Sequence, residues 1–439
     1  MKKLGFYFGL LLIVTLLTAT AGFGKEKVHG SITWWTPWAE DQGPQEIIEA
    51  FNKDYPEIKV EHVKFTNTDE GNVKIDMTLL AGQNIDVFFN FAASRLIPRV
   101  QRGLLQDLSG FIAKDKFNVE TNLGKGIYRY NNKYYALPVG SLTNSVYINE
   151  KMLKAAKIKT PKEWSMEQYK EFAKALTKGE GAKKVYGACD FHSVYYWTMP
   201  ARGLIGSDAW YNAQGMSNFD FPAYKRALQY KYDMENIERT QFPYSEMKFT
   251  KMQAWDVFMQ QRSAMVVASN AIARLINDTN KYPRDYKVTV APLPTLDKNQ
   301  KQNYNKGLYY FDYLGMNAQT KNKQAAWTFM KWLATDGSIY LAKVGHLPTW
   351  KKANKDAVVK ILFGADAESK IDIDAFKRVV LDYESPCYND IEVTAYSQIY
   401  SIIQEEAEKV LFDTGVTVDQ AISNMKKRSD EAIAKERGK

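Results

Sequence analysis

The chain has 439 residues, which is too long for one hydrophobic core and sufficient for two domains. Its formal net charge of +9 comes from 59 basic and 50 acidic residues spread together along the chain, so a solvated, mildly basic surface is favoured over a nucleic-acid-binding one. The four histidines are scattered and the two cysteines lack ligand spacing, which argues against a metal site. Cys189 and Cys387 could pair in an oxidising compartment or remain unpaired.

The first residues have the pattern of a secretory signal peptide. Lys2 and Lys3 precede an apolar run over residues 4–17, and Ala19 and Ala21 provide the small side chains of a cleavage site. We expect residues 1–21 to be removed, although an uncleaved anchor helix is the alternative. Because no cysteine follows the apolar run, a lipid-anchored form is not expected. The mature chain is therefore expected in an exported compartment, most simply the periplasm.

Strand and helix patterns alternate through the next segment, which predicts an α/β architecture. The apolar residues Val73, Met77 and Leu80 mark one face of the second helix, and Gly82 ends it. The expected elements, in chain order, are a strand over 31–35, a helix over 44–55, a strand over 58–63, the helix marked by these three residues, and a strand over 85–89.

The middle of the chain combines turn, strand and helix signals in a short space. Asn131 and Asn132 predict a turn, and a short strand over 133–137 ends at a proline. A second strand is expected over 145–149, followed by a helix from about Met152. A further helix begins at Ser165, which stands in capping-box spacing to Gln168.

This order of elements resembles the family 1 extracellular solute-binding proteins, the capture subunits of ABC importers, which include the maltose-binding type. Further segments are similar to family elements, although Ile85 replaces a usual proline and Gln261 a usual glycine. The segments that carry the likeness are 82–88, 103–108, 131–179, 258–267, 286–294, 324–333 and 345–348, and together they extend it over residues 28–434.

The resemblance implies an α/β, two-lobed periplasmic binding protein of the type II kind, with three interlobe crossings and a ligand cleft between the lobes. The crossings would lie in the segments 131–179, 286–294 and 345–348. One lobe would contain residues 28–138 and 291–345, and the other residues 139–290 and 346–439. Such a protein binds its solute by closing around it and needs no cofactor. It would act as a monomer, without nucleic acid, and deliver the solute to an ABC permease in the inner membrane.

Aromatic residues beside carboxylates and amides favour a carbohydrate ligand, and we expect an oligosaccharide. The chain has 10 Trp, 27 Tyr and 22 Phe, and sugars combine apolar C–H faces with hydroxyl rims. Near predicted strand ends and loops, the candidate ligand-binding residues are Trp35, Trp38, Glu40, Asp41, Asn90, Asn144, Tyr196, Trp197, Trp210, Asn270, Tyr310 and Asp312.

Each candidate has a structural alternative. Strand alternation buries one of Trp34 and Trp35, Asn90 could cap a helix, and the residues around Tyr196 could lie in a core. Trp255, Phe258, Trp327 and Trp332 have helical spacing and are expected in the core. In the maltose-binding type a glutamate stands near the first crossing, whereas Leu142 occupies that position here, which argues against maltose itself.

The sequence leaves two alternative functions open. A glycoside hydrolase would need a pair of carboxylates, for example among Glu40, Asp41, Asp190 and Asp312, but neither an eightfold βα pattern nor a G-x-S-x-G motif is present. The same family also binds non-sugar solutes such as glycerol phosphodiesters and polyamines. Three arginines near predicted cleft loops could serve a phosphate: Arg95, Arg99 and Arg202.

Overall fold

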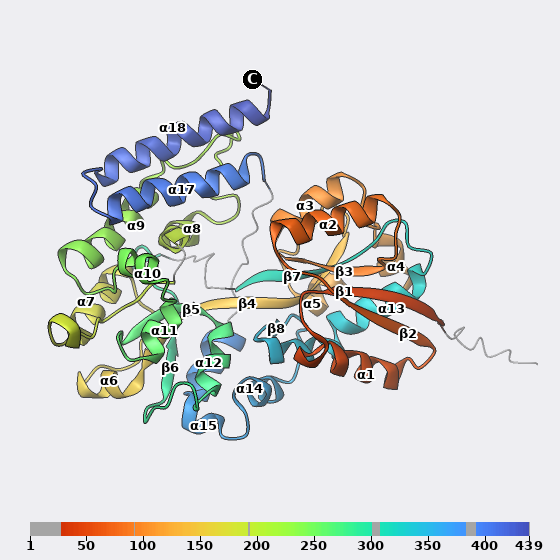
Figure 1. Ribbon diagram of the computed structural model, residues 1–439, viewed down its shortest axis with the longest axis horizontal. Coiled ribbons are helices and arrows are strands. Elements are labelled where there is room, and N and C mark those ends of the chain that lie inside the picture. Colours follow the sequence, from red (N-terminus) through yellow and green to blue (C-terminus); the bar gives the residue numbers. More distant parts are fainter. Residues whose placement is uncertain (1–27, 92, 192–193, 301–307, 383–391, 439) are drawn as a thin grey trace, which may run out of the picture.

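The computed structural model describes residues 28–438 except 92, 192–193, 301–307 and 383–391, so the expected signal peptide and Cys387 lie outside the described residues. Figure 1 shows two lobes joined through their middle by β4 (Ala136–Asn149) and β7 (Leu308–Met316). The eight strands form one sheet in the order β2-β1-β3-β7-β4-β5, with β6 and β8 also paired to β4. The expected two-lobed α/β fold is confirmed.

Lobe 1 is the lobe that packs around Trp34, Phe51 and Phe329. Trp34 is fully buried, and its ring lies 5.1 Å from that of Phe329. Its elements are β1 (Gly30–Thr36), α1 (Pro44–Asp54), β2 (Ile58–Lys64), α2 (Asp69–Leu80), β3 (Val87–Phe91), α3 (Ala93–Gln101), α4 (Ser109–Lys114), α5 (Val119–Leu123), β7 and α13 (Lys323–Ala334). The expected β-α-β-α-β beginning is therefore present.

Lobe 2 packs around a separate core that includes Tyr147, Phe258 and Ile403. The capping box at the start of α7 is confirmed, because Ser165 Oγ accepts from the Gln168 N–H at 3.4 Å and Gln168 Oε1 accepts from the Ser165 N–H at 3.0 Å. Its elements are α6 (Glu150–Ala155), α7 (Met166–Leu176), α8 (Met199–Ile205), α9 (Pro222–Tyr232), α10 (Tyr244–Thr250), α11 (Ala254–Met259), β5 (Met265–Ser269), α12 (Ala273–Asn277), β6 (Val288–Ala291), α14 (Lys355–Phe363), α15 (Ala367–Lys370), α16 (Ile373–Phe376), α17 (Tyr396–Leu411) and α18 (Val418–Glu436).

The first crossing is one continuous strand, whereas two strands with a loop between them were expected. All 14 residues of β4 are buried. Its first half pairs with β7, and its second half pairs with β5 and β6. Pro138 is accommodated because the register with β7 shifts on both sides of Gly140, where a bulge removes the need for a regular ladder.

The other two crossings differ in how well their positions were predicted. The segment expected as the second crossing, 286–294, remains in lobe 2: Leu293 and Leu296 belong to its core, and the Trp164 indole donates to the Pro292 carbonyl at 2.7 Å. The next described element that pairs with lobe 1 strands is β7. At the third crossing, β8 (Leu347–Pro348) pairs with β4. Residues 291–296 thus pack with lobe 2, and the remaining lobe limits stay a prediction.

Helix α2 is rotated relative to its predicted orientation. Val73, Met77 and Leu80 are exposed, and the buried face contains Asn72, Ile75 and Leu79 instead. The reason is electrostatic: the guanidinium of Arg99 is 2% exposed and requires acceptors, which the Asn72 side chain provides at 3.0 Å. The helix therefore turns Asn72 inward together with Ile75 and Leu79.

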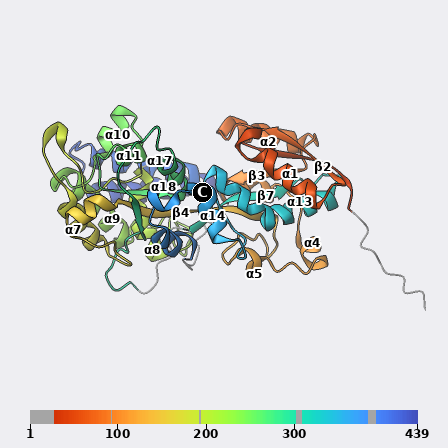
Figure 2. The ribbon, with the colours of Figure 1, turned by 90° about the horizontal axis from the view of Figure 1, so that it is seen from below.

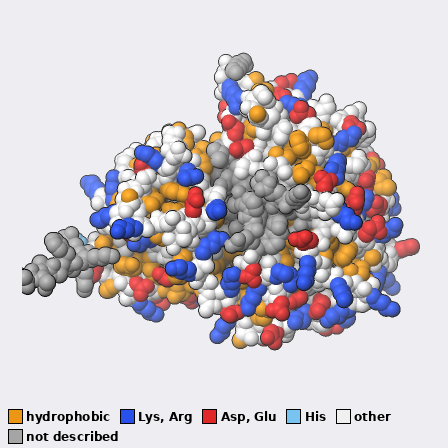
Figure 3. All heavy atoms as spheres, turned by 180° about the vertical axis from the view of Figure 1, so that it is seen from behind, with side chains coloured by type: hydrophobic (Ala, Val, Ile, Leu, Met, Phe, Trp, Pro, Cys, Tyr) orange, Lys and Arg blue, Asp and Glu red, His pale blue; other side chains and the backbone are white. Residues whose placement is uncertain are grey.

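The surface has no strongly charged single-sign face in the view from behind. Figure 3 shows basic and acidic side chains interspersed over both lobes. Within the described part of the chain, none of the helices combines the length and apolar character that a bilayer crossing requires.

The turn before β5 generates a stability prediction. Gln261 stands where the family has glycine, and it adopts φ 59°, a left-handed conformation that disfavours side chains with a Cβ. We expect Gln261→Gly to stabilise the protein by about 1 kcal/mol, or about 2–4 °C in Tm, because strain relief exceeds the added chain entropy. Asn132→Gly is the matched control: Asn132 has φ 60°, but asparagine tolerates this region, so a smaller gain is expected. Equal or reversed effects in calorimetry would contradict the strain argument.

Candidate functional site

The three connections between the lobes meet at a buried carboxylate. Asp312, in β7, is fully buried and contacts His346 Nδ1 from the third crossing. It also lies against Gly140 of β4: a Cβ added at position 140 would come within 2.0 Å of Asp312 Oδ2. Gly140 is therefore required for close approach of the first crossing. Among the described residues, Asp312 Oδ1 has no hydrogen-bond partner.

A second polar contact connects two of these segments. The side-chain oxygen of Asn270 accepts from the Thr143 N–H at 2.7 Å, and its nitrogen donates to the Gly345 carbonyl at 2.5 Å. Asn270 is fully buried, so it satisfies two backbone groups that water does not reach. Both ends of the predicted ligand-binding amide are thus used to hold the first and third crossings together.

Lobe 1 contributes an aromatic group beside this hinge. Trp38 is half-buried, and its ring centroid lies 5.0 Å from Phe89 and 5.7 Å from His346. Phe311 lies 6.1 Å from the same imidazole. We call Trp38, Phe311 and His346 the lobe 1 platform. Its two rings and one imidazole combine apolar faces with a polar group at the interlobe connection.

The other candidates at the start of lobe 1 differ in exposure. Trp35 is half-buried against the lobe 1 core, whereas Glu40 and Asp41 are exposed in the short helix before α1. Glu40 lies 3.9 Å from His62, and Thr36 Oγ1 lies 2.9 Å from the other ring nitrogen of this histidine. These side chains follow β1, as predicted, and Glu40 and Asp41 remain accessible.

Lobe 2 contributes a second aromatic group. Tyr196 is half-buried, its ring lies 4.5 Å from that of Phe191 in a tilted arrangement, and its hydroxyl donates to Asn144 Oδ1 of β4 at 3.4 Å. Phe191 in turn lies 5.4 Å from Trp255, which is only half-buried although a core position was expected. We call Phe191, Tyr196 and Trp255 the lobe 2 platform. Through Asn144 it is tied to the strand that connects the lobes.

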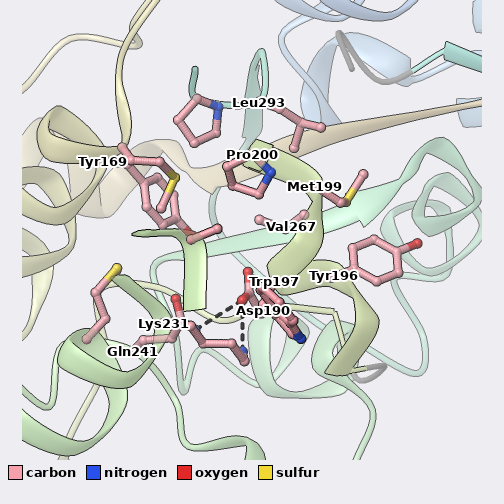
Figure 4. A pocket seen from close by; sticks show the side chains of 14 residues that line it. Tyr169, Asp190, Tyr196, Trp197, Met199, Pro200, Lys231, Gln241, Val267 and Leu293 are labelled. Atoms are coloured by element: carbon pink, nitrogen blue, oxygen red, sulfur yellow. Dashed lines mark hydrogen bonds and ion pairs between the residues drawn. The ribbon is translucent and has the colours of Figure 1, made fainter. Parts of the chain in front are cut away.

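Behind Tyr196 lies a small pocket of about 40 Å³ (Figure 4). Its walls include Tyr169 from α7 and Trp197, both 2% exposed. The Trp197 indole N–H and the Tyr169 hydroxyl have no hydrogen-bond partner among the described residues. The pocket has room for water or for a small group that accepts hydrogen bonds from these donors.

A buried ion cluster forms the floor of this pocket. Lys231 Nζ lies 2.8 Å from Asp190 and 2.6 Å from Glu235, and Gln241 donates to both carboxylates. Burial alone would lower the pKa of Lys231, but the two carboxylates raise it above its ordinary value, so the amine stays protonated. Asp190 is therefore occupied by its contacts with Lys231 and Gln241.

Three further candidates have structural contacts within one lobe. Trp210 is fully buried and stacks on Tyr396 at 4.6 Å, so it packs in lobe 2. The Tyr310 hydroxyl donates to the Lys125 carbonyl at 3.0 Å. Asn90 accepts from Arg99 at 2.8 Å and is fully buried. Ligand contact by any of the candidate residues stays a prediction.

Some residues of the two platforms were missed by sequence reasoning. His346 was considered only as a metal ligand, and Phe191 was not singled out. The available signals were the position of His346 in a crossing segment and that of Phe191 directly after Asp190, within the aromatic run of residues 191–197. Two of the three arginines proposed for a phosphate pair with carboxylates, Arg95 with Asp69 and Arg99 with Asp76 at 2.6 Å, whereas Arg202 is buried and its guanidinium lies 5.3 Å from the centre of the Trp210 ring.

Substitution of Asn270 tests whether this residue holds the first and third crossings together. Asn270→Ala leaves the Thr143 N–H and the Gly345 carbonyl buried without partners, so we expect the free energy of unfolding to fall by about 2–4 kcal/mol. Urea titration of the protein without ligand measures this. Asn144→Ala is the matched control, because it removes one long hydrogen bond at 3.4 Å and should cost about 1 kcal/mol or less. Equal losses would show that Asn270 does not hold the crossings.

The fold is shared with solved binding proteins. A sugar transporter from Rhizobium etli, described as an open conformation, matches with a TM-score of 0.75 and 20% identity, covering 91% of this chain and 99% of its own. The sugar-binding protein MalE from Xanthomonas citri matches with a TM-score of 0.73 and 17% identity over 93% and 98%. UgpB from Mycobacterium tuberculosis, in complex with glycerophosphocholine, matches with a TM-score of 0.70 and 18% identity over 93% and 99%.

Sequence comparison gives the family. A curated relative, the maltotriose-binding protein of Pyrococcus abyssi, is 21% identical over 319 residues, which are 72% of this chain and 65% of that protein. The family model described as "Bacterial extracellular solute-binding protein" matches residues 35–339. Because this match covers most of the chain, the protein belongs to the bacterial extracellular solute-binding proteins, and it is a binding protein rather than an enzyme.

Proposed function

We propose that this protein captures a carbohydrate, of oligosaccharide length, and delivers it to an ABC permease in the inner membrane. The observation that carries the proposal is the pair of aromatic platforms, one on each lobe, beside the interlobe connections. Trp38 and Phe311 supply rings from lobe 1, and Tyr196 supplies one from lobe 2. Rings stack on the apolar faces of sugars, and neighbouring amides and imidazoles hydrogen-bond hydroxyls.

The mechanism requires only that the ligand stabilise one arrangement of the two lobes more than the other. A sugar that contacts both platforms stabilises the arrangement in which they are close, and no covalent step is involved. The hinge contacts at Asp312 and Asn270 keep the three connections together while the lobes move. The permease would then recognise the loaded arrangement. We further propose that residues 1–21 are a cleaved signal peptide and that the mature chain is a periplasmic monomer without a lipid anchor or nucleic-acid partner.

The relatives support a sugar as the ligand more strongly than a phosphodiester. The curated relative is named for maltotriose, and a structural neighbour was solved with glycerophosphocholine. In this chain, however, Arg95 and Arg99 are already paired with carboxylates, which leaves them poorly suited to bind a phosphate. Leu142 still argues against maltose itself.

Thermal unfolding with a panel of ligands tests the class. A ligand at 100 times its Kd stabilises the folded state by about 2.7 kcal/mol, which corresponds to a Tm increase of about 5–10 °C. We expect this increase from one class of oligosaccharide and none from glycerophosphocholine or spermidine. A shift produced only by the phosphodiester or the polyamine would overturn the carbohydrate proposal.

The lobe 1 platform can be tested with the sugar that the panel identifies. We expect Trp38→Ala to weaken binding by about 10- to 100-fold in calorimetry, because a stacking surface is lost. Tyr310→Phe serves as the control: its hydroxyl bonds within lobe 1, so affinity should stay within about twofold. Unchanged affinity in the Trp38 variant would remove this platform from the site.

A further inference from the structure

Helix α2 carries an exposed apolar face that its own lobe does not use. Val73, Met77 and Leu80 are 57%, 65% and 62% exposed. Their i, i+4, i+7 spacing places them on one face of the helix, away from the buried Ile75 and Leu79. We call these three residues the α2 stripe. Of the eight large apolar side chains exposed in the described part of the chain, three are in this stripe, so it is a cluster rather than scattered surface residues.

Lobe 2 also carries a strongly exposed aromatic residue. Phe249, near the end of α10, is 91% exposed. Figure 2 shows α2 and α10 along the same edge of the molecule, one on each lobe. A partner that rests across this edge would therefore lie against one of these helices on each lobe.

Each apolar surface is fixed to its own lobe by ion pairs. Helix α2 is held to α3 through Asp69 with Arg95 and through Asp76 with Arg99 and Arg102. Helix α10 is held to α17 because Lys248 pairs with Glu408 at 2.5 Å. The distance between the α2 stripe and Phe249 therefore changes when the lobes move relative to each other.

Helix α2 is joined by an ion pair to Arg102, which borders a groove between the lobes. Its neighbour α3 forms one wall of a groove of about 370 Å³, and lobe 2 forms the opposite wall. The lining residues are Pro98, Gln101 and Arg102 on lobe 1 and Val393, Tyr396, Ser397, Gln398 and Glu436 on lobe 2. A partner that binds next to this groove would contact a surface whose shape depends on how the two lobes are arranged.

We propose that the α2 stripe and Phe249 are the docking contacts for the membrane-embedded permease, an inference that rests on the proposed transport function. The stripe exposes only a few hundred Å², well below the roughly 1,200 Å² at the low end for stable complexes. Such an area suits a partner that binds and releases in each transport cycle better than a permanent second copy of the chain. Charged residues around the stripe, including Asp69, Lys74 and Asp76, provide the polar rim that transient interfaces have.

Site-specific photo-cross-linking tests the proposal on the full mature chain. A benzophenone amino acid at position 77 or 249 is illuminated with native membrane vesicles from the organism that encodes the chain, with and without maltotriose as the probe sugar. We expect cross-links to an integral membrane protein with several spans, identified by mass spectrometry. Their yield should be several-fold above that at two exposed control positions, Lys114 on α4 and Lys174 on α7.

A second variant shows whether both contacts serve one partner. Val73→Ser, Met77→Gln and Leu80→Gln together should leave the Tm and any sugar-induced Tm shift unchanged, since these side chains are exposed and far from the hinge. The cross-link from position 249 should nevertheless fall several-fold. Cross-links to a second copy of the chain, to lipid only, or at control yield would overturn the proposal. The sugar-induced Tm shift is measured separately, so failure of docking is distinguishable from failure of the carbohydrate proposal.

Discussion

The structure depends on the contact of Asp312 with His346 against Gly140. It joins the strand β7, the third crossing and the first crossing at one buried point. Burying a carboxylate away from water raises the free energy of the folded protein unless a cationic or hydrogen-bond donor group faces it. Moving His346 away from Asp312 would therefore destabilise the protein. Asn270 reinforces the arrangement by bonding the backbone of the first and third crossings. The lobes are thus connected by segments that must move together.

Buried cations set the orientation of elements within each lobe in the same way. Arg99 obtains acceptors from Asn72, Asp76 and Asn90, and this requirement turns α2 so that its apolar stripe faces solvent. In lobe 2, Lys231 is held between Asp190 and Glu235 next to the pocket behind Tyr196. Removing Lys231 would leave the buried Glu235 carboxylate uncompensated, which is more costly than the loss of an exposed ion pair.

A structural feature could be predicted from the sequence where it depends on neighbouring residues. The capping box at Ser165 and the alternation of Trp34 and Trp35 depend on neighbouring residues, and both appear in the structure. The rotation of α2 could not be predicted, because it depends on Arg99, more than 20 residues away. The second crossing was misplaced for a similar reason: Trp164 holds the Pro292 carbonyl in lobe 2, a contact that spans 128 residues. Of the candidate site, the strand-end positions were predictable, whereas the use of Asn90, Asn270 and Trp210 in packing was not.

The hinge contacts also determine where bending can occur. On the lobe 2 side, Asn270 fixes the Thr143 N–H, and on the lobe 1 side, Thr349 fixes the Pro138 carbonyl at 2.7 Å. Between these two points lie the register shifts around Gly140, where the ladder with β7 is already irregular. Between these fixed points, the residue type with the greatest intrinsic backbone freedom is the glycine that Asp312 requires. The same close approach that joins the crossings thus places the least restricted residue type at the irregular part of the hinge strand.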